Sequence, residues 1–304
     1  MSTFAVIASR ATPTSARLGP VLTPAQAVAR LCPGDVALGR LDVLPSLDGV
    51  EPGLWALDIL ERRGVTVLNG RDALATAHDK LATAEALACA GIPHPPTVHV
   101  APWLPPPALE PPLVLKPRFG SWGRDVTRCD SADALRQAID AARLRVWFNA
   151  AGGIAQRLIP PCGFDLRVVV AGGHLVGAVM RQAAPGEWRT NVALGAQRVP
   201  VAPPLEACEL ALAAAAAVGG DLVGIDLLPL PGDGWMVLEV NGAVEFSGAY
   251  SLGAEVFSAA RSALLAGIGF EADAQIGGRA LGNGVPGDLG GLRSDGAHGP
   301  LVAS

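Results

Sequence analysis

The strongest constraint on how this chain folds is the alternation, across residues 1–70, of short apolar segments with segments of helical pattern. Pro24 stands where one helix would begin and Gly64 where another would end, the positions that these residues favour. A strand–helix–strand alternation of this kind predicts a small open α/β unit. The segment that contains Pro13 and Pro20 is expected to be a loop. The predicted strands are 4–9, 36–38 and 65–68, and the predicted helices are 24–32 and 54–63.

Further apolar segments after residue 70 predict more strands, several of them joined as hairpins. Gly172-Gly173 and Pro231-Gly232-Asp233-Gly234 supply glycine-rich turns between neighbouring strands. The proline-dense stretch 102–112 is expected to be a stiff surface connection. Beyond about Ala272 the chain is rich in glycine and has no periodic pattern, which predicts a flexible tail. The predicted strands of this part are 113–117, 126–129, 154–158, 166–171, 175–181, 223–230 and 236–240, and the predicted helices are 79–90, one that starts at Ser131, 205–218 and 254–265.

The composition excludes several classes of protein. The net charge is −5 and no Lys/Arg-rich run is present, so a nucleic-acid partner is not expected. No apolar stretch reaches the roughly 18 residues that a membrane-spanning helix needs. The N-terminus lacks the basic start and long apolar core of a secretory signal. The five cysteines form no C-x-x-C pair, which favours free thiols and a cytoplasmic protein over zinc ligands or disulfides.

Lysine is scarce in this chain, so Lys116 stands out at the end of the apolar segment 113–117. A turn of small residues follows it, with Gly120, Ser121 and Gly123. Glycines let backbone N–H groups approach a phosphate closely, and a serine adds a hydroxyl donor. The turn is neither a Walker A loop nor a dinucleotide-binding fingerprint. Taken alone, it predicts a phosphate cradle and an ordinary glycine hairpin with an exposed lysine about equally well.

Carboxylates interrupt two apolar segments near the end of the folded part. Asp226 lies within Gly-Ile-Asp-Leu-Leu, and Glu239 and Asn241 lie two residues apart within Val-Leu-Glu-Val-Asn. Residues i and i+2 of a strand share a face, so all three side chains converge if the two segments pair. Such hard oxygen ligands suit Mg²⁺. The alternative is that the carboxylates face solvent on an edge strand, but their aliphatic neighbours favour a buried sheet, in which carboxylates need a partner.

Several arginines accompany the strands between these segments. Arg167 follows Asp165 on one predicted strand, Arg181 ends the next, and Arg189 comes shortly after Gly186. Guanidinium groups bind phosphate oxygens in a bidentate manner, so a set of arginines on one face suits a polyphosphate or an acyl-phosphate. Any one of them alone is equally compatible with a surface ion pair of little energetic value.

These segments, in this order, resemble the ATP-grasp fold of RimK-like ligases over residues about 65 to 265. One motif would be weak, but seven in the same order are specific. Gly120-Ser121-Trp122-Gly123-Arg124 is most similar to the LysX branch, as is Val244-Glu245-Phe246 after the last carboxylate motif. The matching segments are Asp79-Lys80-Leu81, Lys116-Pro117 with the glycine turn, Gln156-Arg157-Leu158-Ile159, Asp165-Leu166-Arg167-Val168, Arg189-Thr190-Asn191, Gly224-Ile225-Asp226-Leu227 and Leu238-Glu239-Val240-Asn241.

The resemblance implies a role for each matching residue. Lys80 and Lys116 would bind the ATP phosphates, with Lys116 also near the adenine. Gly120, Ser121 and Gly123 would belong to a mobile lid over the phosphates. Adenine and ribose would contact Gln156, Arg157 and Leu158, and the nucleotide would also contact Asp165 and Thr190. The phosphates would contact Arg189 and Asn191, and the catalytic pair would be Arg167 and Arg189. Two Mg²⁺ ions, with Mn²⁺ as an alternative, would bind to Asp226, Glu239 and Asn241.

The resemblance also implies a mixed α/β (α+β) fold in four parts and a ligase activity. A carboxylate would attack the γ-phosphate of ATP, and an amine would displace phosphate from the resulting acyl-phosphate to form an amide or isopeptide bond. One substrate would be glutamate or a similar amino acid; the acceptor would be a protein, a small acidic carrier protein or a cofactor. Relatives are commonly homo-oligomers. The four parts are an N-terminal domain at 1–70, a central subdomain with the lid at 71–150, a C-terminal subdomain with the Mg²⁺ site at 151–270, and the tail at 271–304.

Two departures from the family pattern affect this interpretation. Arg157, followed by Leu158, replaces the acidic hinge residue that usually binds the ribose hydroxyls, and the lid ends in Arg124-Asp125 rather than in a third glycine. Two alternatives therefore accompany the ligase hypothesis. One is an ATP-binding module without catalysis, to which only Arg157 points, and the other is an ATP-grasp dipeptide ligase.

Overall fold

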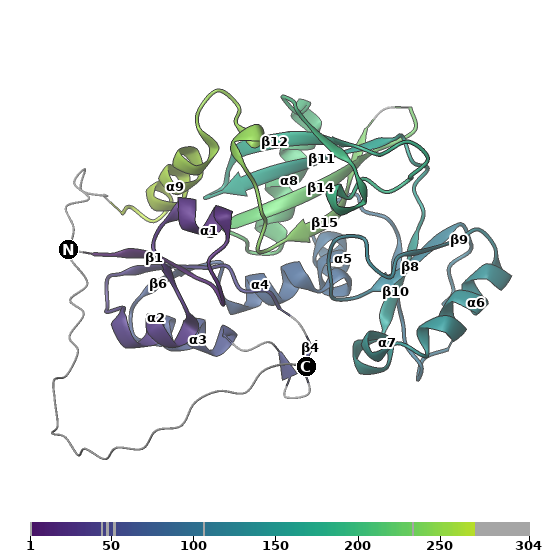
Figure 1. Ribbon diagram of the computed structural model, residues 1–304, viewed down its shortest axis with the longest axis horizontal. Helices are drawn as coiled ribbons and strands as arrows, with labels where there is room; N and C mark the ends of the chain where they lie inside the picture. The colour runs from purple at the N-terminus through teal and green to yellow at the C-terminus, as the bar shows by residue number, and fades with distance from the viewer. Residues whose placement is uncertain are drawn as a thin grey trace, which may run out of the picture. The chain divides into compact units, whose positions relative to one another are not determined.

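The computed structural model describes residues 2–43, 45–46, 49–50, 53–105, 107–232 and 234–270, which form a mixed α/β structure (Figure 1). Three sheets organise these residues: a four-stranded parallel sheet, a four-stranded antiparallel sheet and a five-stranded antiparallel sheet. A two-stranded ribbon, β4 (Pro45–Ser46) with β5 (Gly49–Val50), accompanies the first sheet in sequence. The predicted mixed α/β class is confirmed, whereas the predicted tail lies outside the described residues, as does Asp233 of the predicted turn.

The parallel sheet has the strand order β2-β1-β3-β6, as expected for an open α/β unit. The apolar face of α3, with Leu57 and Leu60 fully buried, packs on one side of this sheet. The segment after β1 is not the predicted loop, because Thr12 and Ser15 form a capping box and Pro13 opens a short helix. The elements of this part are β1 (Phe4–Ile7), α1 (Pro13–Leu18), β2 (Val21–Leu22), α2 (Pro24–Arg30), β3 (Val36–Gly39), α3 (Leu54–Arg62), β6 (Thr66–Leu68) and α4 (Arg71–His78).

The four-stranded antiparallel sheet has the order β7-β10-β8-β9. Alternate residues of β8, Leu113 and Leu115, pack with Phe148 of α7 and Leu135 of α6 in one apolar cluster. Because side chains alternate along a strand, Lys116 belongs to the opposite face. The elements of this part are α5 (Lys80–Cys89), β7 (Thr97–Val100), β8 (Leu113–Pro117), β9 (Thr127–Cys129), α6 (Ala132–Ala142), α7 (Val146–Ala151) and β10 (Gly153–Arg157).

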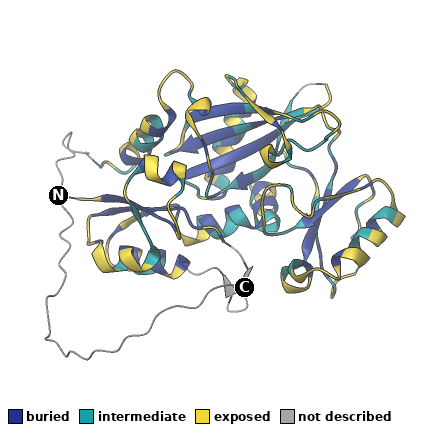
Figure 2. Ribbon diagram, in the orientation of Figure 1, coloured by how far each residue is buried: buried dark blue, intermediate teal, exposed yellow. Residues whose placement is uncertain are grey.

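The five-stranded antiparallel sheet has the order β13-β12-β11-β14-β15, and its inner strands β11 and β14 are mostly buried, whereas the edge strand β13 is mostly exposed (Figure 2). The alanine-rich helix α8 covers one face, where Ala207, Ala211 and Ala214 are fully buried against the aliphatic residues of β11 and β14. Small side chains allow the helix to approach the sheet closely. The elements of this part are β11 (Phe164–Ala171), β12 (His174–Gln182), η1 (Val192–Leu194), β13 (Gln197–Pro200), α8 (Leu205–Ala217), β14 (Leu222–Pro229), β15 (Trp235–Asn241), η2 (Gly248–Tyr250) and α9 (Val256–Ala266).

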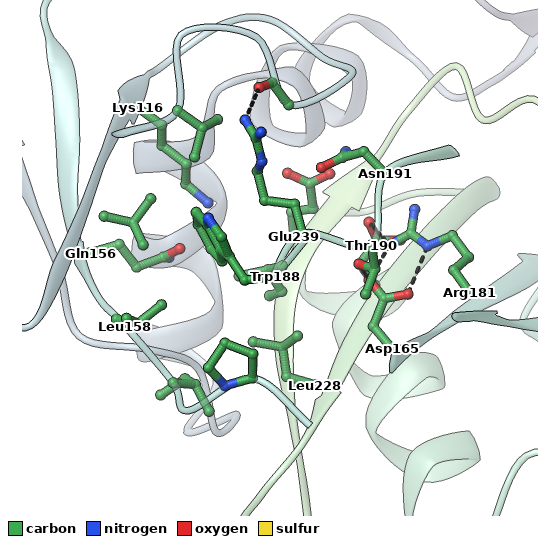
Figure 3. A pocket seen from close by; sticks show the side chains of 18 of the residues that line it. Lys116, Gln156, Leu158, Asp165, Arg181, Trp188, Thr190, Asn191, Leu228 and Glu239 are labelled. Atoms are coloured by element: carbon green, nitrogen blue, oxygen red, sulfur yellow. Dashed lines mark hydrogen bonds and ion pairs between the residues drawn. The ribbon is translucent and has the colours of Figure 1, made fainter. Parts of the chain in front are cut away.

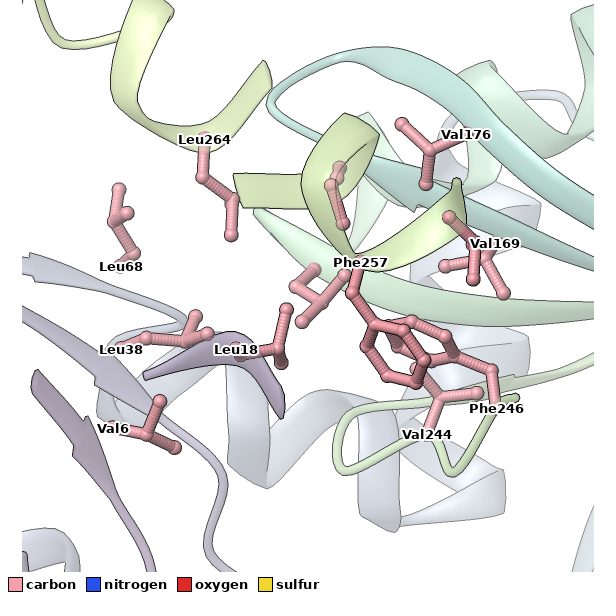
Figure 4. Close-up of a cluster of buried hydrophobic side chains, with 14 of the residues drawn as sticks. Val6, Leu18, Leu38, Leu68, Val169, Val176, Val244, Phe246, Phe257 and Leu264 are labelled. Carbon is pink, nitrogen blue, oxygen red and sulfur yellow. The ribbon is translucent and has the colours of Figure 1, made fainter. Parts of the chain in front are cut away.

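A shared apolar core joins the parallel sheet to the five-stranded sheet (Figure 4). Val6 and Leu38 of the parallel sheet face Phe257 and Leu264 of α9, and Val169 of β11 closes the cluster from the other sheet. Because these side chains are buried together, the apolar core holds the two sheets in a fixed relative position.

Asn69 adds a polar clamp between the same two sheets. It is 1% exposed, directly follows β6, and has a left-handed φ of 50°. Its amide oxygen accepts from the backbone N–H groups of Asp221 (2.7 Å) and Leu222 (2.9 Å), and its amide nitrogen donates to the carbonyl oxygens of Leu222 (2.7 Å) and Gly242 (3.3 Å). Every hydrogen-bonding atom of the side chain is thus used, and Gly242 is fixed immediately after the end of β15.

None of the described helices is both long enough and apolar enough to span a membrane.

Candidate active site

A pocket lies between the four-stranded and five-stranded antiparallel sheets (Figure 3). The glycine loop, defined here as residues 120–123, and the segment 188–191 form further parts of its wall. Arg167 and Asn241 are the predicted site residues that are not among the described lining residues. The predicted residues that line the pocket are Lys80, Lys116, Gly120, Ser121, Gly123, Gln156, Arg157, Leu158, Asp165, Arg189, Thr190, Asn191, Asp226 and Glu239.

The strand register explains why the charged residues of the five-stranded sheet meet on one face. Asp165 is opposite Arg181 across β11 and β12, and Arg167 is opposite Asp226 across β11 and β14. Asp226 is in turn opposite Glu239 across β14 and β15. Residues directly opposite one another on paired strands project to the same side of the sheet. The other face carries the aliphatic residues that pack against α8.

Four of these residues form a buried network of alternating charge. The Arg181 Nε atom donates to Asp165 Oδ1 (2.7 Å), and Arg181 Nη2 donates to Asp226 Oδ2 (2.8 Å). Arg167 binds the same Asp226 carboxylate through its Nε and Nη2 atoms. Burial alone would raise the pKa of Asp226, but Arg167 and Arg181 outweigh burial and lower that pKa to about 2. Burial likewise opposes the charge on Arg181, yet the two carboxylates raise its pKa well above the usual value.

Lys116 occupies the opposite wall of the pocket, on β8. It is 7% exposed, and burial lowers its pKa to about 8. The positive charge of Lys80 lowers this pKa further, whereas the negative charge of Glu239 raises it. Lys80, in the first turn of α5, donates from Nζ to the carbonyl oxygen of Gly120 (2.6 Å). Two cations therefore border the pocket near the glycine loop, and one of them is held there against a substantial desolvation cost. An anionic ligand would lower that cost.

The glycine loop depends on left-handed backbone conformations. Gly120 and Gly123 have φ values of 124° and 69°, which glycine adopts without the steric cost of a side chain. A Cβ atom on Gly123 would lie 2.7 Å from Asn191 Oδ1, so a side chain there would have to displace the Asn191 side chain. Arg189 Nη1 donates to the carbonyl oxygen of Gly123 (3.2 Å). The loop thus contacts the residues that were predicted to bind phosphates.

The hinge residues lie where β10 leaves the four-stranded sheet. Gln156 is buried and donates from Nε2 to Thr97 Oγ1 (2.8 Å). The backbone N–H of Arg157 donates to Pro96 O (2.9 Å), and that of Leu158 donates to Pro112 O (3.0 Å), immediately before β8. The hinge backbone is therefore fixed by the sheet, and the Arg157 side chain lines the pocket where an acidic residue was expected from the family pattern.

The carboxylates on β14 and β15 fit a magnesium site with few protein ligands. Glu239 lines the pocket, and its side chain makes no ion pair or hydrogen bond with any described residue. Asn241 donates from Nδ2 to Gly224 O (3.3 Å), which leaves its amide oxygen for a ligand. Asp226 keeps only the lone pairs that Arg167 and Arg181 do not use. No group of three His, Cys, Asp or Glu among the described residues is placed to hold a metal, and a Mg²⁺ ion here would need substrate phosphates and water as its other ligands.

Sequence reasoning missed several residues of the pocket. Trp188 points into the pocket toward Lys116 and Gln156 (Figure 3), and Leu228 and Leu238 supply an apolar floor from the carboxylate-bearing strands. An aromatic residue directly before Arg189, in an otherwise polar turn, was the available signal for Trp188. Pro160 and Pro161 extend the wall after the hinge, and their role could not be read from the sequence alone.

Known proteins resemble this chain in sequence and in fold. The chain matches the RimK-like ATP-grasp domain over residues 77–258. It is 32% identical over 221 residues to the glutamate–LysW ligase ArgX of Sulfurisphaera tokodaii, with 71% of this chain and 78% of that protein covered. It is 29% identical over 256 residues to the tetrahydromethanopterin:α-L-glutamate ligase of Methanosarcina acetivorans, with 71% and 77% covered. The D-alanine–D-alanine ligase of Bacillus anthracis complexed with ATP shares the fold, with a TM-score of 0.60, 15% identity, and 88% and 96% of the two chains covered.

The fold, the pocket and these relatives define the chain as an ATP-grasp enzyme, a carboxylate–amine ligase that forms C–N bonds. It belongs to the RimK-like ATP-grasp family, whose members use ATP and Mg²⁺. The predicted resemblance and the predicted ligase activity are thereby confirmed.

Proposed function

We propose that this ligase adds glutamate or a similar amino acid to a carrier protein or cofactor through an acyl-phosphate. The observation that carries the proposal is the arrangement of Lys80, Lys116 and Arg189 around the glycine loop, with the carboxylate of Glu239, which has no ion-pair partner in the described part of the chain, facing them across the pocket. Cations and loop N–H groups suit a triphosphate, and a carboxylate beside them suits the Mg²⁺ that accompanies it. Two relatives, which are named as ligases of glutamate with LysW or with tetrahydromethanopterin, support the choice of substrate class.

The pocket suggests how the nucleotide lies. Its base and ribose would lie against the hinge, between Gln156 and Leu158 on one wall and Leu228 on the other. Its phosphates would extend toward Lys80 and Lys116, under the glycine loop. The hinge carboxylate of the family pattern is missing, so the ribose hydroxyls would be held by other groups near Arg157.

The chain's own work in the reaction would be positioning and charge neutralisation. Lys116 and Arg189 would balance the charge that develops on the transferred phosphoryl group, and Arg167 would act from the neighbouring buried network. Glu239 and Asn241, with Asp226 beside them, would hold Mg²⁺, whose charge would reduce the repulsion between the phosphates and the attacking carboxylate. The phosphoryl transfer and the later attack by the amine need no protein nucleophile. Two ions are proposed, with Mn²⁺ as a substitute.

Asp165 and Thr190 would support the nucleotide indirectly. Asp165 is fully buried and bound by Arg181, and the Thr190 hydroxyl donates to the same carboxylate. This contact anchors the end of the 188–191 segment to β11. Asp165 therefore acts on the ligand through the residues that it holds. A homo-oligomeric state and a cytoplasmic location remain further parts of the proposal.

A dipeptide ligase is the main alternative, because the D-alanine–D-alanine ligase shares the fold. That likeness concerns the fold alone. A non-catalytic ATP-binding module is the other alternative, and the intact set of cations and carboxylates around the pocket speaks against it.

The test is ADP release from Mg²⁺-ATP across a panel of amino acids, each with and without candidate acceptors. The acceptors include small acidic carrier proteins with a C-terminal glutamate, and pterin-type cofactors. ADP release that needs both glutamate and one acceptor, and that is lost in Glu239→Gln, is the expected result. Release with pairs of free amino acids alone would identify a dipeptide ligase, and nucleotide binding without turnover across the panel would identify a non-catalytic module.

A further inference from the structure

Glu187 lies at a turn that opens the pocket segment 188–191. Its backbone N–H donates to Ala184 O (3.0 Å), and the preceding Gly186 has a left-handed φ of 79°. The Glu187 carboxylate folds back onto its own segment, because Oε1 accepts from the backbone N–H groups of Trp188 (2.9 Å) and Arg189 (3.0 Å). The carboxylate thus caps the start of the segment that carries the predicted phosphate ligands.

The same carboxylate also holds the Arg189 guanidinium along one edge. Arg189 Nε donates to Glu187 Oε1 (3.0 Å), and Arg189 Nη2 donates to Glu187 Oε2 (2.8 Å). A bidentate pair fixes the plane of a guanidinium as well as its position. The nitrogen that remains, Nη1, points to the glycine loop, where it donates to the carbonyl oxygen of Gly123. Glu187 therefore determines which edge of Arg189 faces the loop and the pocket.

We propose that Glu187 is a positioning residue for Arg189, which it holds ready to bind the phosphates of the nucleotide. The inference rests on the proposed function, because it needs Arg189 to contact those phosphates. Trp188 and Arg189 line the pocket, whereas Glu187 is not among the described lining residues. Its effect on a ligand is therefore exerted through Arg189.

The exposure of the pair favours this role over one in stability. The side chains of Arg189 and Glu187 are 25% and 21% exposed, and an ion pair that stays in contact with solvent contributes little to folding. Ordering of a long side chain upon binding lowers affinity by about two- to tenfold. A guanidinium that is already held in place avoids that loss. The pKa of Glu187 is lowered to about 2, mainly by its hydrogen bond with the Arg189 side chain, so the pair stays charged at all physiological pH values.

The test is a double-mutant cycle on Mg²⁺-ATP affinity, measured by titration calorimetry. The proteins are the wild type, Glu187→Gln, Arg189→Ala and the double variant. Glutamine keeps an oxygen for the two backbone N–H groups but loses the charge and the two-oxygen fork that hold the guanidinium. We expect Glu187→Gln to weaken ATP binding about fivefold in the wild-type background. We expect no further weakening when the same change is made in Arg189→Ala, with thermal unfolding unchanged throughout.

Three results would overturn the inference. Unchanged or tighter binding by Glu187→Gln would mean that the carboxylate only caps the turn or competes with the phosphates for Arg189. Equal weakening by Glu187→Gln in both backgrounds would mean that it acts on the segment without Arg189. Unchanged affinity in Arg189→Ala would remove the phosphate contact itself. A wild-type protein that fails to bind Mg²⁺-ATP would be a different result, because it would refute the proposed function at its first step.

Discussion

We predict that Lys116 makes nucleotide binding sensitive to pH in the alkaline range. Burial lowers its pKa from 10.5 to about 8, so the free protein loses this cation as the pH rises through 8. Nucleotide phosphates beside Lys116 favour the protonated form, so binding should take up a proton whenever the free lysine is neutral. If only the protonated form binds tightly, the apparent dissociation constant grows by a factor of one plus ten to the power of the pH minus 8. From pH 7 to pH 9 the affinity should fall about tenfold.

The contribution of Lys116 to folding stability changes with pH in the opposite direction to its contribution to nucleotide affinity, so the two contributions can be distinguished. The pKa of Lys116 is lower in the folded chain than in the unfolded chain, so the unfolded chain binds more protons between pH 8 and 10.5. Over that range Lys116 makes the folded state more stable as the pH rises. Weaker nucleotide binding at pH 9 therefore cannot be attributed to unfolding caused by this residue. Thermal unfolding of the free protein across the same pH range checks that condition.

The assay is calorimetric titration with Mg²⁺-ADP at pH 8.5, in buffers of different ionisation enthalpy. About three quarters of the free protein should have a neutral Lys116 at that pH. Binding of one nucleotide should therefore be accompanied by the uptake of roughly 0.75 proton by Lys116. Lys116→Arg is the matched control, because a guanidinium stays protonated throughout. Its proton uptake should vanish, and its affinity should be flat from pH 7 to pH 9. Absence of proton uptake by the wild type, together with a flat affinity, would refute the assignment of Lys116 to the phosphates.

Three further changes test the fold and the site. Asn69→Ala should destabilise the protein by about 3 kcal/mol, because it leaves the buried N–H of Leu222 and the part-buried N–H of Asp221 without a partner, and the midpoint of thermal unfolding should fall by at least about 6 °C; an unchanged midpoint would contradict the clamp. Gly123→Ala should weaken ATP binding about tenfold, because its Cβ would meet Asn191 Oδ1, whereas the control Gly173→Ala, equally left-handed but open to solvent, should leave binding unchanged in the same calorimetric titration. Glu239→Gln should lower the rate of ADP release at least about 100-fold while the unfolding midpoint is retained, and wild-type rates in this variant would exclude Glu239 as a metal ligand.

The sequence was most informative where local pattern and pairing coincide. Asp226 and Glu239 each interrupt an aliphatic run, and a single short turn joins the two runs, so antiparallel pairing was the simplest arrangement. The register then confirms that the two residues are direct neighbours. The helix at 205–218 was predicted from its alanine-rich composition and the glycine pair that follows it, and the strand at 113–117 from its short apolar run that ends on a lysine.

The short helices could not be predicted by periodicity. The helices α1 and α7 each span six residues, too few to show an apolar stripe, and α4 directly precedes α5, so the pair has no loop signal between them. Pro13 was taken for a loop residue, although Thr12 and Ser15 around it form a capping box. Local hydrogen-bonding chemistry, and not hydrophobic pattern, decides the conformation of such segments.

The pairing of the arginines was equally inaccessible. Arg167 meets Asp226, 59 residues away, only because β14 returns beside β11 after α8. That adjacency depends on the order of strands in the sheet, which no local pattern encodes. The pairing of Glu187 with Arg189 could not be predicted either, for a different reason. The two residues are only two positions apart, but nothing in the sequence distinguishes this pair from an ordinary exposed ion pair.

The buried network and the pocket cations divide the charge of the site between two tasks. Within the network each guanidinium faces a carboxylate, so Arg181, Arg167, Asp165 and Asp226 nearly cancel one another. Such pairs contribute little net stability, because desolvation offsets their attraction, but they fix geometry strictly once they form. Lys116, in contrast, has no ion-pair partner among the described residues and is held at a lowered pKa. The charge that the fold leaves uncompensated therefore lies where a triphosphate would supply the missing counter-charge, and the compensated charges form the rigid platform behind it.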